Sequence, residues 1–448
     1  MPQFQLPDRP GSRLSPFQII ILGFSGIILT GAFLLMLPFA SNTGQQTSFS
    51  DALFTAVSAV CVTGLVICDT AVHWSLFGQA VILVLIQIGG LGIVTAAVSL
   101  AVLTGKRLSL KQRSTLQEAV SAPQVGGVAG FTKLILGVTF LTELAGALVM
   151  LPVFTKDFGT YGIWMSCFHS VSAFCNAGFD LMGRTGNLCS SLTSYVHHPA
   201  VNLAVMFLIV SGGIGFVTWE DIRTHWLRFN HYRPQSKIIL STTAFLILVP
   251  AVCFYFLEFS GIPAPERILA SLFQSVTART AGFNTVSLGD MSGAGQAVMI
   301  ALMLIGGSPG STAGGMKTTT FAVLWAGTRA VLRRDEDPQL FHRRIGAETM
   351  KHASALLTLY LILSLGGALV ISRAESLPVS ECLYETASAL GTVGLSLGIT
   401  PQLGLLSRSI LMILMFLGRV GSLTFAYAAF SGAGMQFARL PQANITVG

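Results

Sequence analysis

The sequence is short of charge. Only 10% of its 448 residues are Asp, Glu, Lys or Arg, against about 25% in an average soluble domain. No charged residue occurs between Arg13 and Asp51, or between Asp69 and Lys106, and each gap exceeds the roughly 20 residues that a membrane-spanning helix requires. The shortage excludes soluble globular, disordered and fibrous proteins, and the uncharged runs predict a protein that crosses the membrane several times.

Paired cysteines and metal-binding motifs are also missing. The seven cysteines are scattered, and no pair has the spacing of metal ligands. The adjacent His197 and His198 are too few ligands for a zinc site. We therefore expect no catalytic residues and no covalently bound cofactor. Residues 1–16 do not have the pattern of a signal peptide, and we expect them to form a cytoplasmic N-terminal segment.

Apolar runs, in contrast, are abundant, and they come in pairs. Eight are long enough to span a membrane: 17–38, 76–103, 131–153, 200–219, 238–259, 295–325, 353–372 and 405–430. Inside each pair lies a half-apolar segment of roughly 12 residues, too short to cross. These short segments are 51–62, 161–174, 266–278 and 379–390. They predict four re-entrant helices, called pore helices below.

Basic residues are concentrated in the loops that follow each pair. They form three clusters: Lys106, Arg107, Lys111 and Arg113; Arg223, Arg228, Arg233 and Lys237; and Arg329, Arg333, Arg334, Arg343, Arg344 and Lys351. Because cytoplasmic loops accumulate Lys and Arg, this distribution predicts that both termini are cytoplasmic and that the pore helices enter from the outer side. The net charge of +7 has the same origin, and nucleic-acid binding is not required to explain it.

The four short segments are copies of one pattern. They read LFTAVSAVCVTGL (53–65), CFHSVSAFCNAGF (167–179), LFQSVTARTAGF (272–283) and LYETASALGTVGL (383–395), and their last glycines recur at close to a quarter of the chain. A regular internal period indicates a repeat architecture. We therefore predict an all-α polytopic membrane protein of four pseudo-fourfold-related repeats, each a helix, a pore helix, a filter loop and a second helix. The predicted repeats are 17–104, 130–225, 236–332 and 350–430, with a cytoplasmic tail at 431–448.

The loop after each pore helix is a candidate ion filter. Non-helical backbone at membrane depth is tolerated only where it lines a cavity or is buried in protein, and rings of backbone carbonyls can replace the hydration shell of a potassium ion. The alternative is that the glycines only pack helices closely. The predicted filter segments are Val62, Thr63 and Gly64; Asn176, Ala177 and Gly178; Thr280, Ala281 and Gly282; and Thr392, Val393 and Gly394.

The second helix of the third repeat contains a segment that cannot be helical. Residues 306–315, GGSPGSTAGG, hold five glycines and a proline, whose helix propensities are the lowest. Two cations, Lys317 and Arg419, lie in or beside apolar runs, where ionisable residues are functional candidates. A snorkelling or carboxylate-paired Arg419 is the alternative. For Glu143 we favour a structural role, and for Arg279 an orienting role behind the third filter.

These motifs resemble the Trk/Ktr/HKT superfamily of potassium transporters. The segments SVTARTAGFNT (275–285) and GGSPGSTAGGMKTTT (306–320) are most similar to its bacterial Ktr membrane subunit, KtrB. The resemblance implies one glycine per filter segment and, because Gly64 is not the serine of sodium-carrying plant relatives, selection of potassium. It also implies a gate below the filter. The gate residues would be Gly306, Gly307, Ser308, Pro309, Gly310, Ser311, Thr312, Ala313, Gly314, Gly315, Lys317 and Arg419.

The resemblance has further implications for location and partners. It predicts a multi-pass protein of the bacterial inner membrane, a homodimer, and a cytosolic nucleotide-binding ring of RCK-type, KtrA-like subunits. The only metal ion implied is K+ at the filter carbonyls. The sequence leaves open whether Na+ is a coupling or activating ion, and a sodium-preferring or Na+/K+ cotransporting relative is the first alternative. An integral-membrane enzyme would need a catalytic constellation that is not evident, and conventional secondary transporters usually have twofold repeats.

Overall fold

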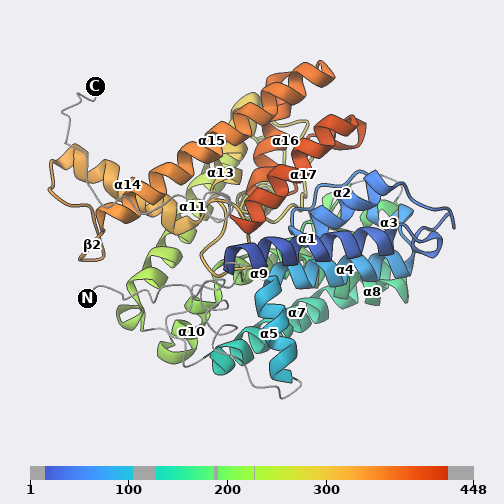
Figure 1. Ribbon diagram of the computed structural model, residues 1–448, viewed down its shortest axis with the longest axis horizontal. Coiled ribbons are helices and arrows are strands. Elements are labelled where there is room, and N and C mark those ends of the chain that lie inside the picture. The colour runs from blue at the N-terminus through green and yellow to red at the C-terminus, as the bar shows by residue number, and fades with distance from the viewer. Residues whose placement is uncertain (1–15, 104–127, 186–189, 227, 422–448) are drawn as a thin grey trace, which may run out of the picture.

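The computed structural model describes residues 16–103, 128–185, 190–226 and 228–421, and this part of the chain is almost entirely helical. Figure 1 shows its helices and the one short hairpin among the described residues. The predicted N-terminal segment, the C-terminal tail and the basic cluster at Lys106, Arg107, Lys111 and Arg113 lie outside the described residues.

The helices follow one another in the order that the repeats predict. The first two groups are α1 (Pro16–Leu35), α2 (Phe49–Val60), α3 (Thr70–His73), α4 (Leu76–Leu91) and α5 (Ile93–Leu103), then α7 (Val128–Phe158), α8 (Tyr161–Phe174), α9 (Pro199–Gly213) and α10 (Phe216–His225). The last two are α11 (Pro234–Leu257), α12 (Ala264–Thr277), α13 (Gly293–Leu304) and α14 (Thr318–Arg333), then α15 (Ala347–Glu375), α16 (Val379–Gly391) and α17 (Leu405–Val420). Strands β1 (Gln339–Leu340) and β2 (Arg343–Arg344) pair antiparallel between α14 and α15.

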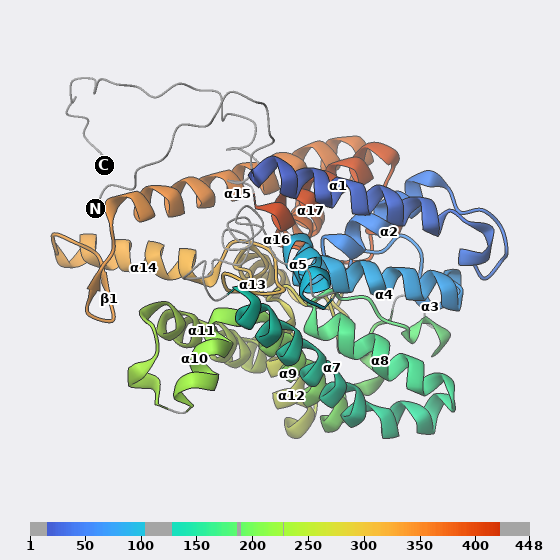
Figure 2. The same cartoon turned by 60° about the horizontal axis from the view of Figure 1, so that its bottom comes forward.

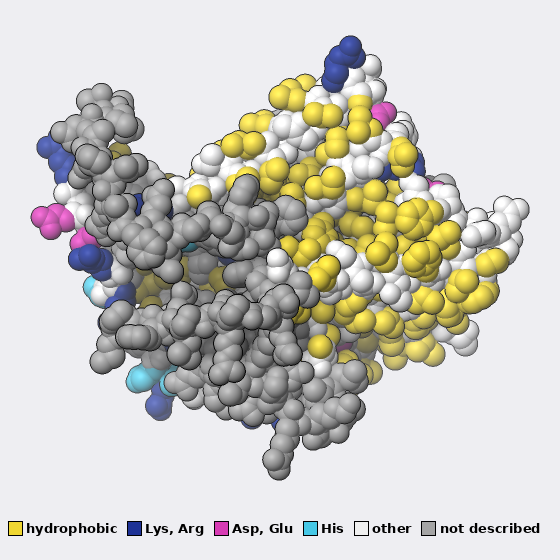
Figure 3. All heavy atoms as spheres, in the orientation of Figure 1, with side chains coloured by type: hydrophobic (Ala, Val, Ile, Leu, Met, Phe, Trp, Pro, Cys, Tyr) yellow, Lys and Arg dark blue, Asp and Glu magenta, His cyan; other side chains and the backbone are white. Residues whose placement is uncertain are grey.

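The first helix of each repeat is long and apolar. Among the described residues, α1, α7, α11 and α15 are each long and apolar enough to cross a membrane, and α9 with α10 would make a fifth span if the bent pair counts as one. Large hydrophobic side chains remain exposed on these helices, including Leu141 at 70% and Ile362 at 62%. Figure 3 shows hydrophobic side chains spread over the side of the molecule that carries α15, α17 and α1. Such a surface suits lipid rather than water.

The second helix is broken in more than one repeat, whereas the sequence predicted an interruption in the third repeat alone. Gly92 separates α4 from α5 with φ +81°, and Gly215 separates α9 from α10 with φ +86°, where the chain bends by 98°. In the third repeat the break is expanded into the loop between α13 and α14, and α17 ends at Gly421 with φ +94°. The predicted total of eight spans therefore remains a prediction.

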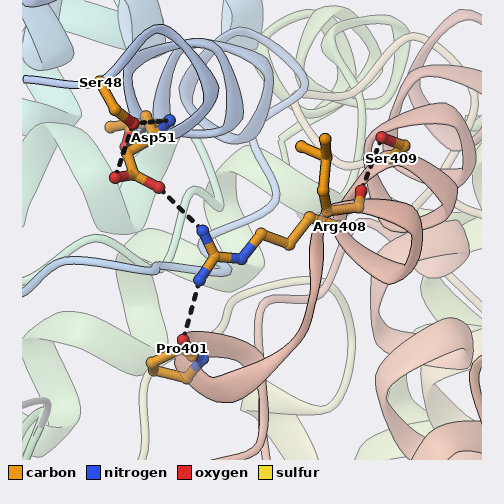
Figure 4. A network of polar contacts seen from close by, with 7 residues as sticks. Ser48, Asp51, Pro401, Arg408 and Ser409 are labelled. Carbon is orange, nitrogen blue, oxygen red and sulfur yellow. Dashed lines mark hydrogen bonds and ion pairs between the residues drawn. The ribbon is translucent and has the colours of Figure 1, made fainter. Parts of the chain in front are cut away.

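The fourth repeat meets the first. Helix α17 packs against α2, and both views place α1 and α2 beside α17 (Figures 1 and 2). Arg408, in the first turn of α17, donates one hydrogen bond to Asp51 Oδ1 at 2.9 Å and another to the Pro401 carbonyl at 3.0 Å. Asp51 belongs to the first turn of α2, which Ser48 caps (Figure 4). This ion pair joins residues that are 357 positions apart and closes the arrangement of repeats.

Candidate functional site

The four predicted filter glycines lie next to one another in a closed ring. Each has a positive φ, between +68° and +92°. A Cβ atom added to Gly64 would lie 2.5 Å from the Ala177 carbonyl oxygen, and one added to Gly282 would lie 2.5 Å from the Val393 carbonyl oxygen. The close approaches connect successive repeats in the order Gly64 to Gly178, Gly178 to Gly282, Gly282 to Gly394, and Gly394 back to Gly64. Only glycine fits at such positions.

The residue two places before each glycine has the same unusual backbone. Val62, Asn176, Thr280 and Thr392 have φ values of +57°, +59°, +64° and +53°. A positive φ is uncommon for residues other than glycine, and it is an outlier for β-branched ones. Its recurrence at four corresponding positions shows that the filter segments share one backbone conformation, which the surrounding structure must hold in place.

A hydroxyl from each pore helix holds the filter backbone, and the sequence analysis did not identify these residues. Ser58 and Ser388 accept hydrogen bonds from the N–H groups of Gly64 (3.1 Å) and Gly394 (3.0 Å). In the second and third repeats the hydroxyl instead donates to the carbonyl after the glycine: Ser172 to Phe179 at 2.7 Å, and Thr277 to Phe283 at 2.5 Å. The signal in the sequence was a Ser or Thr recurring five or six residues before each glycine.

The glycine-rich loop, residues 306–315, lies against the inner ends of these elements. The Thr312 hydroxyl donates to the carbonyl of Phe174, the last residue of pore helix α8, at 3.0 Å. The loop also fills the break between α9 and α10, because the N–H of Phe216 donates to the Gly310 carbonyl at 2.9 Å and the N–H of Ser308 donates to the Gly213 carbonyl at 2.9 Å. All of the predicted loop residues therefore lie together beside the second and third repeats.

The two ends of this loop are tied to each other. Ile305 and Met316 form an isolated bridge, in which the N–H of Gly306 donates to the Met316 carbonyl at 2.7 Å. The N–H of Thr318 donates to the Gly307 carbonyl at 3.0 Å. The residues between these bonds form an excursion whose base stays closed without them.

Both predicted cations contact the loop. Arg419 donates to the carbonyls of Thr312 and Gly89, and to that of Gly90 at 2.9 Å, so it joins the fourth repeat to the third and the first. Lys317 Nζ donates to the Ala313 carbonyl at 2.8 Å. Within the described ranges, neither cation forms an ion pair with a carboxylate. Carbonyl binding of this kind suits the planar donors of arginine.

Three other residues singled out in the sequence have different surroundings. Arg279 is buried, and its guanidinium donates to Thr243 Oγ1 on α11 at 3.4 Å. Glu143 accepts a hydrogen bond from Gln87 on α4 at 3.0 Å. His197 Nδ1 lies 2.9 Å from Glu266 Oε1. The described part of the chain contains no group of three side chains able to hold a metal ion.

A cavity of about 360 Å³ opens on the other side of the glycine ring from the glycine-rich loop. All four filter glycines line it, together with the carboxylates Asp69 and Asp180. Burial raises the pKa of the Asp180 carboxyl to about 7, the N–H of Met182 opposes this rise, and the nearby Asp69 carboxylate adds to it. Asp180 lies beyond the membrane-spanning helices, and its charge therefore changes close to neutral pH.

The titration of Asp180 predicts a pH-dependent entry of cations. Above its pKa the carboxylate is negative and attracts a cation to the cavity, whereas below it the neutral acid does not. Between pH 6 and 8 we expect cation influx at subsaturating concentration to rise by about threefold, since a unit charge a few ångströms away in water is worth about 1 kcal/mol. Isotope influx into proteoliposomes measures it. Asp180→Asn should abolish the rise, and an unchanged pH profile in this variant would contradict the assignment.

Comparison with known proteins places this geometry in context. Residues 9–433 match the TrkH family, described as a cation transport protein. The chain is 38% identical to the "Potassium/sodium uptake protein NtpJ" of Enterococcus hirae, over 99% of both chains. It is also 38% identical to the "Ktr system potassium uptake protein B" of Bacillus subtilis, over 97% of this chain and 95% of that protein. The crystal structure of the potassium transporter TrkH from Vibrio parahaemolyticus has the same fold, with a TM-score of 0.73 at 18% identity, over 95% of this chain and 85% of that chain.

Proposed function

Because this chain belongs to the TrkH family of cation transport proteins, we propose that it is the ion-conducting subunit of a potassium uptake system. The membership confirms the family resemblance seen in the sequence. The chain is a multi-pass membrane protein and a cation transporter, not an enzyme. The observation that carries the proposal is the closed ring of Gly64, Gly178, Gly282 and Gly394.

The ring supports a filter built from backbone carbonyls. Glycine lets four chains approach closely with positive φ, and the carbonyls of the filter segments can then face the ion path. The pore helices end at the filter segments, so the negative ends of their dipoles favour a cation there by about 0.3–1 kcal/mol each. Asp69 and Asp180 on the outer cavity add an attractive potential for cations.

The glycine-rich loop, with Lys317 and Arg419, is proposed to be the gate. Its position across the ring from the outer cavity, its many backbone hydrogen bonds and its cationic neighbours all support this role. A fixed positive charge at the inner end of a path repels potassium while the loop is closed. Movement of α14, which begins directly after Lys317, would then open or close the path.

A potassium and sodium transporter is the second candidate. One relative, from Enterococcus hirae, is named a potassium/sodium uptake protein and matches this chain over 99% of its length. Gly64 favours potassium as the preferred ion, but it does not decide whether sodium is cotransported or activates transport. Potassium influx with and without external sodium distinguishes the two candidates.

We further propose that the subunit is a homodimer in the bacterial inner membrane, with cytoplasmic termini, and that it works with a cytosolic nucleotide-binding ring. Relatives named as proteins B and D of a Ktr system support the need for a partner subunit. The segment from the end of α14 to the start of α15 supplies a basic surface around β1 and β2. Figures 1 and 2 show α14 and this hairpin extending from the body at one end. Basic side chains there can orient a partner.

Potassium uptake by a deficient host tests the function. We expect cells that lack their own uptake systems to accumulate potassium when they express this chain together with a nucleotide-binding Ktr partner, and to accumulate much less with the chain alone. The purified chain should be a dimer in mild detergent. Failure of both strains to take up potassium, with the protein present in the membrane, would refute the proposed function. Full uptake by a monomer without the partner would refute only the assembly.

A further inference from the structure

One position of the pore helices is polar and buried in all four repeats, and the proposed filter does not use it. It is the residue directly after the shared aromatic: Thr55, His169, Gln274 and Glu385. Their side chains are at most 3% exposed. A buried polar group must find hydrogen-bond partners, because leaving it without them costs about 1–3 kcal/mol. The partners of these four residues differ in an informative way.

Glu385 binds the chain that leaves the fourth filter segment. Its Oε1 accepts hydrogen bonds from the Ser396 hydroxyl at 2.5 Å and from the N–H of Leu397 at 3.2 Å. Its Oε2 accepts one from the Thr400 hydroxyl at 2.8 Å. All of these donors are neutral, and the described residues provide no ion pair for this carboxylate. Ser396 and Leu397 line the outer cavity together with Gly394.

His169 occupies the same position in the second repeat and makes the corresponding contact. Its Nδ1 lies 2.8 Å from the Met165 carbonyl, which can only accept, so Nδ1 carries the proton. Its Nε2 is then free to accept the hydrogen bond from the N–H of Leu181, at 3.3 Å. Leu181 follows Gly178 by three residues. In both repeats, therefore, one pore-helix side chain holds the backbone just beyond the filter glycine.

The other two repeats lack this contact. Thr55 donates to the carbonyl of Asp51 in its own helix at 2.8 Å. Gln274 donates to Met299 Sδ on α13 at 3.4 Å, and its Oε1 has no hydrogen-bond partner. The braced repeats are the second and the fourth, which lie opposite each other in the order of the glycine ring. The fourfold pattern of the sequence is thus twofold in the way the pore helices support it.

We propose that Glu385 and His169 are positioning residues for ion selection, which fix the outer ends of the fourth and second filter segments so that their carbonyls keep the spacing that suits potassium. The inference rests on the proposed function, and it adds specificity-determining residues that do not touch the ion. Two opposite segments held rigidly set the width of the ring, while the first and third segments follow them. The carboxylate acts through its hydrogen bonds and not through its charge.

The test compares paired variants in proteoliposomes, by the ratio of potassium to sodium permeability. Glu385→Leu and His169→Leu remove the contacts and should each lower the ratio about tenfold, since hydrogen bonds to a charged group are worth about 1.5–3 kcal/mol and 1.4 kcal/mol is tenfold. Glu385→Gln and His169→Gln keep an acceptor in place and should restore the ratio to near that of the unmodified protein. The matched controls Gln274→Leu and Thr55→Val, at the same position of the unbraced repeats, should leave it unchanged.

Each outcome decides one point. An unchanged ratio in Glu385→Leu, or an equal loss in the Gln274→Leu control, would overturn the proposal. A loss in Glu385→Gln as large as that in Glu385→Leu would show that the charge acts and not the hydrogen bonds, and would also overturn it. If Glu385→Leu does not reach the membrane, the His169 pair decides. Potassium influx through the unmodified protein in the same vesicles tests the proposed function separately.

Discussion

Deletion of Gly310–Gly314 is expected to raise potassium flux about tenfold or more, since 1.4 kcal/mol taken from the closed state changes its population tenfold. The deleted residues include Thr312, which is bound by Arg419 and binds the Phe174 carbonyl, and Gly310, which is bound by the N–H of Phe216. A typical hydrogen bond contributes about 1 kcal/mol net, so the loss of several is enough for this effect. The filter segments are not touched.

The structure also explains why this deletion should be tolerated. The bridge between Ile305 and Met316 and the bond from Thr318 to the Gly307 carbonyl lie outside the deleted residues and keep α13 and α14 joined. Flux is measured as potassium uptake by vesicles that contain equal amounts of each protein. Thr312→Val, which removes only the hydroxyl bond, should give a smaller rise. A deletion variant that reaches the membrane and conducts no faster than the unmodified protein would rule out gating by this loop.

Substitution of Gly64 by serine is expected to lower the preference for potassium over sodium about tenfold, since a displaced carbonyl no longer matches the dehydrated ion. At φ +92° an L-residue is strained, and its Cβ would lie 2.5 Å from the Ala177 carbonyl oxygen. The clash is with backbone, so the neighbouring filter segment must move. The permeability ratio from reversal potentials, or from competing isotope fluxes, measures the change.

Gly44→Ser is the matched control for this substitution. Gly44 also has a positive φ, +67°, but a Cβ there meets nothing within 4 Å, and the residue lies outside the filter segments. The control separates general backbone strain from the contact with the Ala177 carbonyl. Equal selectivity in the Gly64→Ser variant and the unmodified protein would mean that these carbonyls do not select the ion.

The local features of this protein could be predicted from its sequence because they depend on neighbouring residues. Low charge and long apolar runs indicated membrane helices, and the repeated short segments correspond to α2, α8, α12 and α16. A proline and five glycines within ten residues excluded a helix at 306–315. The family resemblance rested on the same motifs, and the comparisons confirm it. The breaks at Gly92 and Gly215 were missed, although each lies in a glycine pair or triplet that the repeats share.

The remaining features depend on contacts between distant residues, which only the tertiary structure decides. Arg419 meets the Gly89 carbonyl 330 residues away, and Arg408 meets Asp51 across 357 residues. No local propensity encodes such a pairing, because it arises only when four repeats pack around one axis. The same packing distinguishes residues that the sequence aligns. Thr55 and Gln274 occupy the position of Glu385, yet only Glu385 and His169 have the outgoing filter backbone within hydrogen-bonding reach.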